Sequence, residues 1–423
     1  MTPLVKVFQL LNSATNYAVL RNFDFLPLNY SRDIDIIINR EDFYNIRHQI
    51  ISVFEKSDYK LLQYYKGSEM HSLVFVEAKP PYDIISFDFL FSIYVKDTIL
   101  LSSVDVLKSK IYNGKVYHVR KDMEFLSKYL YNILLNELYP DKYKHIKSEA
   151  LQHYGQEIAT RLAELDIDNS TSLNHVRYIQ YKRHFSQMLS AQFRYLAATI
   201  SNFIHPQGIS ISFTGPDGVG KTTIINNIVE ILEKLYKDIP IYHFRPTILG
   251  NLGEVAHKAG LKKNIDREYN KPHRGEKTNV ISSILRLLYY SLDYVVGYHR
   301  KQKYQIFQRK IVVYDRYFTD IICDGRRSRI FLKHKFLYWW GKLFIPSLDY
   351  NILLTASAET ILSRKQELDA ESITSINKKI DYLASKKGYT KILNDTIPQN
   401  AVEKILSYIF EQQHKKNLLR LKL

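Results

Sequence analysis

One octet constrains the fold of this chain more than any other feature. Residues 215–222 read Gly-Pro-Asp-Gly-Val-Gly-Lys-Thr and fit the pattern GxxxxGK[ST]. A β-branched run, 209–214, precedes the octet, and an amphipathic run, 221–236, follows it, so it joins a predicted strand to a predicted helix. Glycines let backbone N–H groups curl round a phosphate, and the helix N-terminus adds positive potential there. The octet therefore predicts a nucleotide-phosphate site.

The residue types of the octet assign roles to its members. We expect the phosphates of ATP to be held by Gly215, Gly218, Val219, Gly220, Lys221, Thr222 and Thr223. The lysine reaches the β and γ oxygens, and the hydroxyl of Thr222 is a predicted ligand of Mg²⁺. The alternative is a glycine-rich turn before a helix, without a ligand.

A second motif follows the predicted strand 311–315. Asp315 stands at the tip of that strand, where a carboxylate beside the phosphate loop is placed to hold Mg²⁺ or its waters. Arg316 comes next and can grip a phosphate through two hydrogen bonds. The alternative is a salt bridge that caps the strand. Strands at 209–214, 311–315 and 350–355 alternate with helices, which predicts a parallel α/β sheet flanked by helices.

Residues 208–423 resemble the thymidylate kinase-type P-loop kinases. The resemblance rests on the octet, on 244–246 (Phe-Arg-Pro), on 315–317 (Asp-Arg-Tyr), and on 353–355 with 363–365. It implies that Asp217 touches the sugar hydroxyl of the acceptor, that Arg316 binds the acceptor phosphate and that Asp315 organises Mg²⁺. It also implies that Arg364 belongs to a lid over the phosphoryl group. Lys365 is added to that lid by proximity.

Two positions depart from that family, which reads thymine with a helix of the form Phe-Ala-x-Asp-Arg and with a polar–x–x–Tyr patch. Here the helix segment reads Tyr-Ser-Leu-Asp-Tyr over 290–294, so Tyr294 replaces the arginine, and Asp324 replaces the tyrosine of the patch. Hydrogen-bonded specificity needs its partner groups. We therefore expect the phosphotransfer to be kept and the acceptor to differ from dTMP. The acceptor-side candidates are Asp217, Arg245, Tyr290, Tyr294, Asp320, Arg326 and Arg327.

The positive charge of the chain is concentrated in its second half. The net charge is +17, and residues 1–207 hold 24 basic and 22 acidic side chains against 36 and 21 in residues 208–423. Whatever attracts anions is thus expected in the second half. The single cysteine, Cys323, excludes an intramolecular disulfide and a cysteine-based zinc site. Without a signal-peptide pattern, a soluble cytoplasmic protein is expected, and no nucleic-acid motif stands out.

A basic, aromatic stretch follows the second motif. Residues 326–342 hold six Lys or Arg and two Trp, without an acid. Three interpretations stay open: a solvated helix with a buried aromatic face, a mouth for a polyanionic acceptor, and a helix on a membrane surface. The tail 414–423 suits peripheral membrane contact as well, and a homodimer is a further expectation. Residues 315–327 are similar to a subgroup of these kinase-like proteins in bacteria, found near cell-surface polysaccharide genes, which implies such a pathway.

The first half carries a second candidate site. Asp33 and Asp35 lie on one face of a predicted strand, and Asp88 lies in another. The layout resembles the nucleotidyltransferase fold, whose carboxylates bind two Mg²⁺ ions. However, 20–22 reads Leu-Arg-Asn where that fold has a Gly-Ser phosphate turn. The alternatives are an active transferase, an inactive sugar- or nucleotide-recognition fold, and an unrelated α/β domain.

The sequence thus predicts an α/β protein of three parts. A small α+β nucleotidyltransferase-like core spans 1–103, a helical extension and linker spans 104–207, and a P-loop kinase domain spans 208–423. The expected activity is transfer of the ATP γ-phosphoryl to an acceptor phosphate or hydroxyl, with Mg²⁺. The alternatives are a dTMP kinase, a Mg²⁺-dependent nucleotidyltransferase through the three aspartates, and a non-catalytic ATP-gated adaptor.

Overall fold

The chain divides into two compact units. The computed structural model describes residues 2–30, 33–168, 170–234, 236, 238–245, 248–249 and 279–422. The first unit comprises Met1–His205 together with Phe410–Leu423, and the second comprises Pro206–Ile409. The sequence placed the last residues with 208–423, whereas the structure groups them with the first unit.

A five-stranded parallel sheet forms the centre of the second unit. Its order is β11 (Ile241–His243), β12 (Ile311–Asp315), β10 (Ile209–Thr214), β13 (Tyr350–Thr355) and β14 (Tyr389–Leu393). β10 is buried along its whole length because helices cover both faces of the sheet. This arrangement confirms the predicted parallel sheet flanked by helices and is consistent with a P-loop kinase-like fold.

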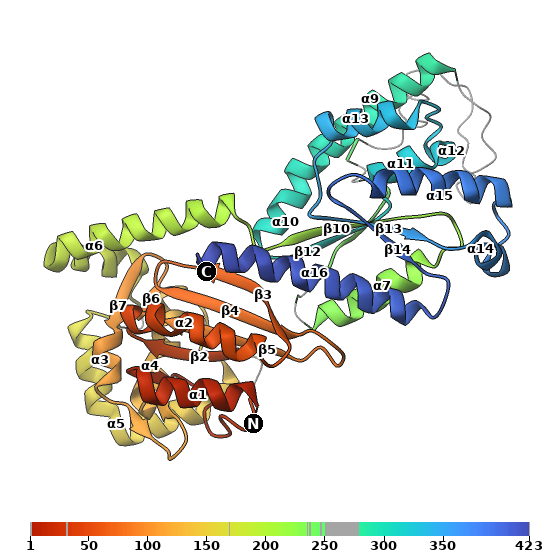
Figure 1. Ribbon diagram of the computed structural model, residues 1–423. Helices are drawn as coiled ribbons and strands as arrows, with labels where there is room; N and C mark the ends of the chain where they lie inside the picture. Colours follow the sequence, from red (N-terminus) through yellow and green to blue (C-terminus); the bar gives the residue numbers. More distant parts are fainter. Residues whose placement is uncertain are drawn as a thin grey trace. The chain divides into compact units, whose positions relative to one another are not determined.

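Helices cover the two faces of this sheet in two groups (Figure 1). One face carries α7 (Lys221–Glu233) and the first part of α16 (Pro398–Leu421), and the other carries α9 (Val280–Gly297), α11 (Phe318–Cys323), α13 (His334–Phe344) and α15 (Ala370–Ala384). Shorter helical segments are a π-helix (Tyr298–Gln302), α10 (Lys303–Phe307), α12 (Gly325–Ser328) and α14 (Ala358–Arg364). The parallel strands bring the loops after β10, β12 and β13 to one edge, where open α/β sheets bind ligands.

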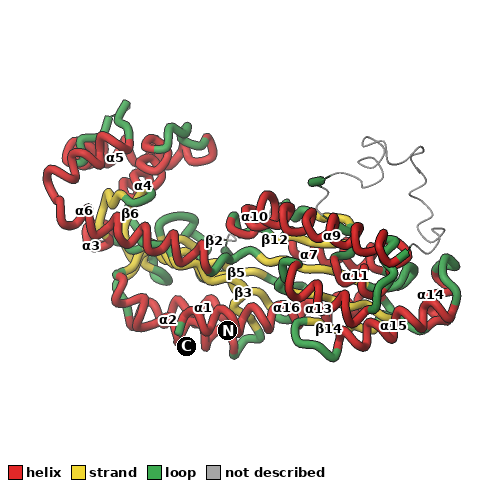
Figure 2. Tube along the Cα trace, turned by 90° about the horizontal axis from the view of Figure 1, so that it is seen from above, coloured by secondary structure: helices red, strands yellow, loops and turns green. Residues whose placement is uncertain are grey.

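The first unit is built on a mostly antiparallel sheet. Its order is β3 (Tyr59–Lys66), β4 (Met70–Glu77), β5 (Ile84–Leu90), β2 (Asp33–Ile38), β1 (Tyr17–Val19), β9 (Tyr117–His118) and β8 (Ile111–Tyr112). The pairs β2–β5 and β1–β9 are parallel. A separate hairpin joins β6 (Ser92–Val95) to β7 (Thr98–Ser102). The helices are α1 (Pro3–Ala14), α2 (Arg40–Glu55), α3 (Ser103–Leu107), α4 (Lys121–Leu134), α5 (Lys144–Glu164) and α6 (Leu173–Ile204); Figure 2 separates them from the strands by colour.

Two hydrophobic cores lie on opposite faces of this sheet. Ile36 and Ile38 of β2 point into a core with α1 and α2, whereas Ile37 points into a core with α4, α5 and α6. Alternate strand residues face opposite sides, so a fully buried strand supplies both cores. Carboxylates on such a strand therefore lie in a protein interior or at its rim.

The end of α16 covers the edge of this sheet. β3 is the edge strand, with an irregular register between Leu61 and Gln63. At that point the Leu61 N–H donates to Nδ1 of His414 (3.0 Å), and the Asn417 side-chain amide donates to the carbonyl of Leu62 (2.8 Å). The tail 414–423, predicted for membrane contact, thus has His414 and Asn417 buried while Leu419 is 76% exposed. Membrane contact through it stays a prediction.

The predicted helical extension contains two strands that were missed. The sequence predicts a helical extension and linker over 104–207, but β8 and β9 form a hairpin within that range. Asn113 and Gly114 lie between the two strands, and Gly114 has φ +88°. Asn-Gly is a strong hairpin signal because both residues tolerate positive φ. The two-residue strands are too short to show alternation, which explains the error.

Candidate phosphate-binding site

The loop after β10 has a backbone that glycine alone fits well. A Cβ on Gly215 would lie 2.5 Å from the carbonyl oxygen of Leu354, and one on Gly220 would lie 2.8 Å from Nδ2 of Asn394. Gly218 and Gly220 also have φ of +87° and +90°. Side chains are excluded by contact at Gly215, by conformation at Gly218, and by both at Gly220. The loop thus keeps its backbone bare at the N-terminus of α7.

Lys221 begins α7 and folds its side chain back into the loop. Its Nζ donates to the carbonyl oxygens of Gly215 (2.7 Å) and Pro216 (2.9 Å). Burial and the neighbouring guanidinium of Arg316 lower the pKa of Lys221 to about 8. The first N–H groups of α7 have no intrahelical partner, and Thr222 and Thr223 are exposed beside them. The helix terminus and the lysine together make an electropositive cradle.

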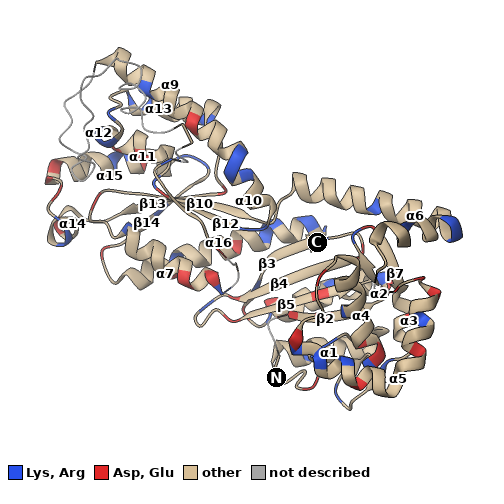
Figure 3. Cartoon of the chain, turned by 180° about the vertical axis from the view of Figure 1, so that it is seen from behind, with Lys and Arg blue, Asp and Glu red and all other residues tan. Residues whose placement is uncertain are grey.

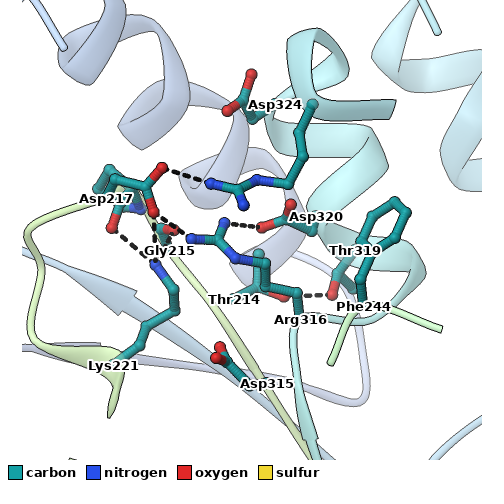
Figure 4. A network of polar contacts seen from close by, with 12 residues as sticks. Thr214, Gly215, Asp217, Lys221, Phe244, Asp315, Arg316, Thr319, Asp320 and Asp324 are labelled. Atoms are coloured by element: carbon teal, nitrogen blue, oxygen red, sulfur yellow. Dashed lines mark hydrogen bonds and ion pairs between the residues drawn. The ribbon is translucent and has the colours of Figure 1, made fainter. Parts of the chain in front are cut away.

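Asp217 lies at the centre of three cations (Figure 4). Its carboxylate pairs with the guanidinium of Arg316, with Nη2 of Arg327 at 2.6 Å and with Nζ of Lys221 at 3.8 Å. These residues come from α7, from the end of β12 and from α12, and the carboxylate itself belongs to the loop. The carboxylate of Asp217 thus holds three positively charged side chains together at the edge of the sheet.

Arg316 is fixed by its backbone and by a buried acid. It has φ +74°, and its N–H donates to the carbonyl of Phe213 in β10 (2.9 Å). Its Nη1 donates to Oδ1 of Asp320 (2.9 Å), a carboxylate that is 1% exposed. Burial raises the pKa of Asp320, and the charge of Arg316 opposes that rise. Asp320 therefore holds the guanidinium from its buried side, and a contact of Asp320 with the acceptor stays a prediction.

The two carboxylate oxygens of Asp315 have different surroundings. Its Oδ2 lies 3.2 Å from Nδ1 of His243, while its Oδ1 is buried without a hydrogen-bond partner among the described residues. A hydroxyl and a carboxylate are donors that Mg²⁺ accepts, and Mg²⁺ usually completes its shell with water and phosphate oxygens. Thr222 with Asp315 therefore fits such an ion. Within the described residues no cluster of three or more His, Cys, Asp or Glu could hold a metal by itself.

Arg364, at the end of α14, contacts the chain segment that follows β14. Its Nη1 donates to the backbone carbonyl of Asn394 (2.9 Å), and its Nη2 donates to that of Thr396 (3.2 Å). Asn394 in turn donates its side-chain amide to the carbonyl of Val219 (2.8 Å). Asn394 was not predicted from the sequence, although its place just after β14 is a signal that could have found it.

The predicted acceptor-side residues near α9 connect this helix to the chain after β11. Arg245 and Asp293 are both buried and pair at 3.1 Å, and the guanidinium lies 4.7 Å from the ring centroid of Tyr290. The Tyr294 hydroxyl donates to the carbonyl of Phe244 (2.5 Å). These positions hold the backbone after β11 onto α9. Tyr290 and Tyr294 were predicted from the sequence, but Asp293 was not. Asp293 lies between them in the sequence and forms the ion pair with Arg245.

Arg326 and Arg327 are consecutive residues of α12, but their side chains lie in different surroundings. Asp324 caps that helix by accepting from the N–H of Arg326 (3.2 Å). The side chain of Arg327 pairs with Asp217, whereas that of Arg326 is exposed. The structure therefore brings Arg327 into the cluster and leaves Arg326 beside it.

The basic, aromatic stretch 326–342 ends in an exposed helix face. On α13, Leu337 is buried, whereas Trp339, Leu343 and Phe344 are 55%, 72% and 52% exposed. Residues 325–348 contain no acid, and Figure 3 marks the Lys and Arg residues. One described helix, Val280–Phe307, has the length and composition of a membrane span, but such helices also occur in soluble cores. Membrane contact and a homodimer stay predictions.

The three aspartates of the first unit are only partly brought together. The parallel register places Asp35 of β2 directly beside Asp88 of β5. Asp33 is exposed at the start of β2, opposite Ser86. Arg21 Nε lies 2.5 Å from Oδ2 of Asp35. The predicted carboxylate pair exists, and an arginine already neutralises one member.

No family model matches the sequence, and no curated protein matches it. One matching solved structure is thymidylate kinase from Ehrlichia chaffeensis, with 16% identity and a TM-score of 0.34, covering 48% of this chain and all of that one.

Proposed function

We propose that the second unit is an ATP-dependent phosphotransferase of the thymidylate-kinase-like type. The observation that carries the proposal is the cluster of Lys221, Arg316 and Arg327 on the carboxylate of Asp217. This cluster lies at the carboxyl edge of a parallel sheet, on a bare glycine loop that opens a helix. Convergent cations in that position suit a phosphoryl group, whose negative charge is spread over several oxygens.

The donor phosphates would occupy the cradle of the loop. The N–H groups at the start of α7 would donate to them, and Lys221 would exchange its two backbone carbonyls for phosphate oxygens. Thr222 and Asp315 would hold Mg²⁺, which supplies charge neutralisation at the β and γ oxygens. Catalysis here is mostly positioning and electrostatic stabilisation by residues already in place.

The acceptor would meet the arginines. Arg316 and Arg327 would transfer from Asp217 to the acceptor or migrating phosphoryl, and Asp217 would be released toward an acceptor hydroxyl. Arg364, exposed at the end of α14, would close on the phosphoryl group from the other side. The acceptor is a phosphate or hydroxyl compound, in our proposal from a cell-surface polysaccharide pathway.

The contacts of the predicted acceptor-side residues do not favour recognition of a thymine base. The segment that reads the base in thymidylate kinases is engaged here in internal contacts, since Asp293 pairs with Arg245 and Tyr294 bonds the Phe244 carbonyl. A base would have to replace those contacts, at the cost of leaving buried polar groups without partners. The dTMP kinase alternative is tested by adding dTMP and measuring dTDP.

Two substitutions test the kinase proposal. Lys221→Ala should abolish ADP release in the presence of the acceptor, and Arg316→Ala should lower it about 10³-fold, the lower range for a transition-state arginine. Lys404→Ala is the control, because that lysine is exposed on α16 without a role in the site. Near-normal turnover in either site variant would remove the proposal. An adaptor would bind ATP and stay at background turnover with every acceptor.

A further inference from the structure

A cavity in the first unit lies beside the carboxylate pair. It measures about 480 Å³, within the range of small-molecule sites. Its polar lining includes Arg21, Asp35, Asp88, Tyr94, Lys96 and Lys128. These side chains come from the end of β1, from β2, β5 and β6, from the β6–β7 turn and from α4. Residues far apart in sequence therefore converge on one space.

The cavity does not fit the two metal ions of a nucleotidyl-transfer centre. Two ions need carboxylates that face them, and the guanidinium of Arg21 already lies 2.5 Å from Oδ2 of Asp35. Asp33, the third carboxylate of that arrangement, is exposed and does not line the cavity. Bringing a cation beside a bound guanidinium costs Coulomb repulsion. The arginine takes the place that a metal would need.

The charges that line the cavity select a particular kind of ligand. Three cations, Arg21, Lys96 and Lys128, face two carboxylates, so the lining carries one net positive charge. Ionised carboxylates only accept hydrogen bonds, and ammonium groups only donate them. A ligand that combines an anionic group with hydrogen-bond donors such as hydroxyl groups can contact both kinds of side chain. The apolar remainder of the lining, which includes Met70 and Ile93, suits the carbon face of such a compound.

We propose that this cavity is a metal-independent binding site for a small phosphomonoester that carries free hydroxyl groups. Arg21 and Lys128 bind the phosphate, and Asp88 with the Tyr94 hydroxyl contacts the hydroxyl groups. The site recognises this ligand and does not transfer a nucleotide to it. The inference is independent of the function proposed for the second unit.

Calorimetric titration of the full chain tests this site. The protein carries Lys221→Ala, so that the phosphate loop of the second unit does not contribute, and the buffer contains excess EDTA. The probes are inorganic phosphate, an unphosphorylated hexose, a hexose phosphate and a nucleoside monophosphate. We expect at least one of the two phosphomonoesters to bind tighter than both phosphate and hexose, and the better ester identifies the source of the ligand.

Variants locate the binding. Lys128→Ala should weaken the better ester at least tenfold, and Tyr94→Phe should weaken it without affecting inorganic phosphate. Lys115→Ala, an exposed lysine of the same unit, is the matched control and should change nothing. The proposal is overturned if no ester binds, or if Lys115→Ala weakens binding as much as Lys128→Ala. It is also overturned if, in a separate titration without EDTA, Mg²⁺ alone binds and Asp35→Asn abolishes that binding.

Discussion

Lys221 is the residue whose charge most depends on what fills the loop. Its ammonium group is buried and lies near Arg316, and both conditions favour the neutral form, so its pKa falls to about 8. Phosphate oxygens at the same place would favour the charged form. Binding of a nucleotide should therefore raise this pKa and take up a proton wherever the free lysine is neutral.

A pH series of nucleotide binding tests this coupling. As pH rises above about 8, free Lys221 loses its proton, so ATP affinity should fall by up to about tenfold per pH unit. Below that pH the affinity should be flat with respect to this group. Lys221→Arg keeps a charged side chain throughout and should remove the decline above pH 8. An equal decline in the arginine variant would assign the effect to another group.

Gly220 tests the bare backbone of the loop. Gly220→Ala places a Cβ 2.8 Å from Nδ2 of Asn394 and strains a backbone at φ +90°, so ATP binding should weaken at least tenfold, about 1.4 kcal/mol. Gly388→Ala is the matched control, because it has φ +94° but no atom within 4 Å of the new Cβ. Gly388 lies just before β14, outside the phosphate loop, so its variant strains a backbone away from the site and should bind ATP as the unchanged protein does. Equal losses in the two variants would assign the effect to general destabilisation and not to the loop.

The sequence was enough to identify the side chains of the loop but not what supports them. The glycine spacing and Lys221 are local features, and Asp217 was readable within the octet. Asn394, which bonds Val219 from the end of β14, is separated from it by most of the domain. Asp293 was passed over for the same reason, since its partner Arg245 lies in a different element. Long-range partners leave no periodic trace in one sequence.

At the scale of the elements, the last turns of α16 cover the edge strand β3 of the first unit. An edge strand exposes backbone groups that can pair with other chains. Here His414 and Asn417 bond Leu61 and Leu62 in place of a further strand. A polar helix end thus covers the sheet edge where the β3 register is irregular.

Removing one of these side chains should destabilise the first unit. Asn417→Ala leaves the buried carbonyls of Leu61 and Leu62 without their donor, so the free energy of unfolding should fall by about 1–3 kcal/mol. Leu419→Ala, at an exposed position of the same helix, should stay within about 0.5 kcal/mol. Urea unfolding followed by hydrogen exchange at β3 measures both. Similar effects of the two variants would contradict a specific edge contact.

Element boundaries followed the local patterns. The strands predicted at 311–315 and 350–355 agree with the structure residue for residue, because most of their residues are apolar or aromatic and the chain around them is more polar. β3 and α1 were missed, although both contribute to the same core. β3 mixes Lys and Gln with its apolar residues, since its outer edge meets a helix end and not another strand.

At the scale of the whole molecule, the charge excess is only partly explained. The cluster on Asp217 accounts for some of the positive side chains of the second unit, and their charges are largely balanced by Asp217, Asp315 and Asp320. Much of the remainder lies outside the site, on the π-helix after α9 and along 329–342. Those three acids offset the formal charges of Lys221, Arg316 and Arg327, so the surplus positive charge of the second unit lies on other residues.

Transfer of the γ-phosphoryl group of ATP is tested most directly with radiolabelled ATP. The full chain is incubated with Mg²⁺, an acceptor panel of nucleoside monophosphates, sugars and lipid-linked glycans, and ATP labelled at either the α or the γ phosphate. A kinase transfers label from the γ position to an acceptor and releases ADP, and Lys221→Ala should lose both. Label from the α position with pyrophosphate released, or turnover that survives Lys221→Ala, would contradict the proposed kinase function.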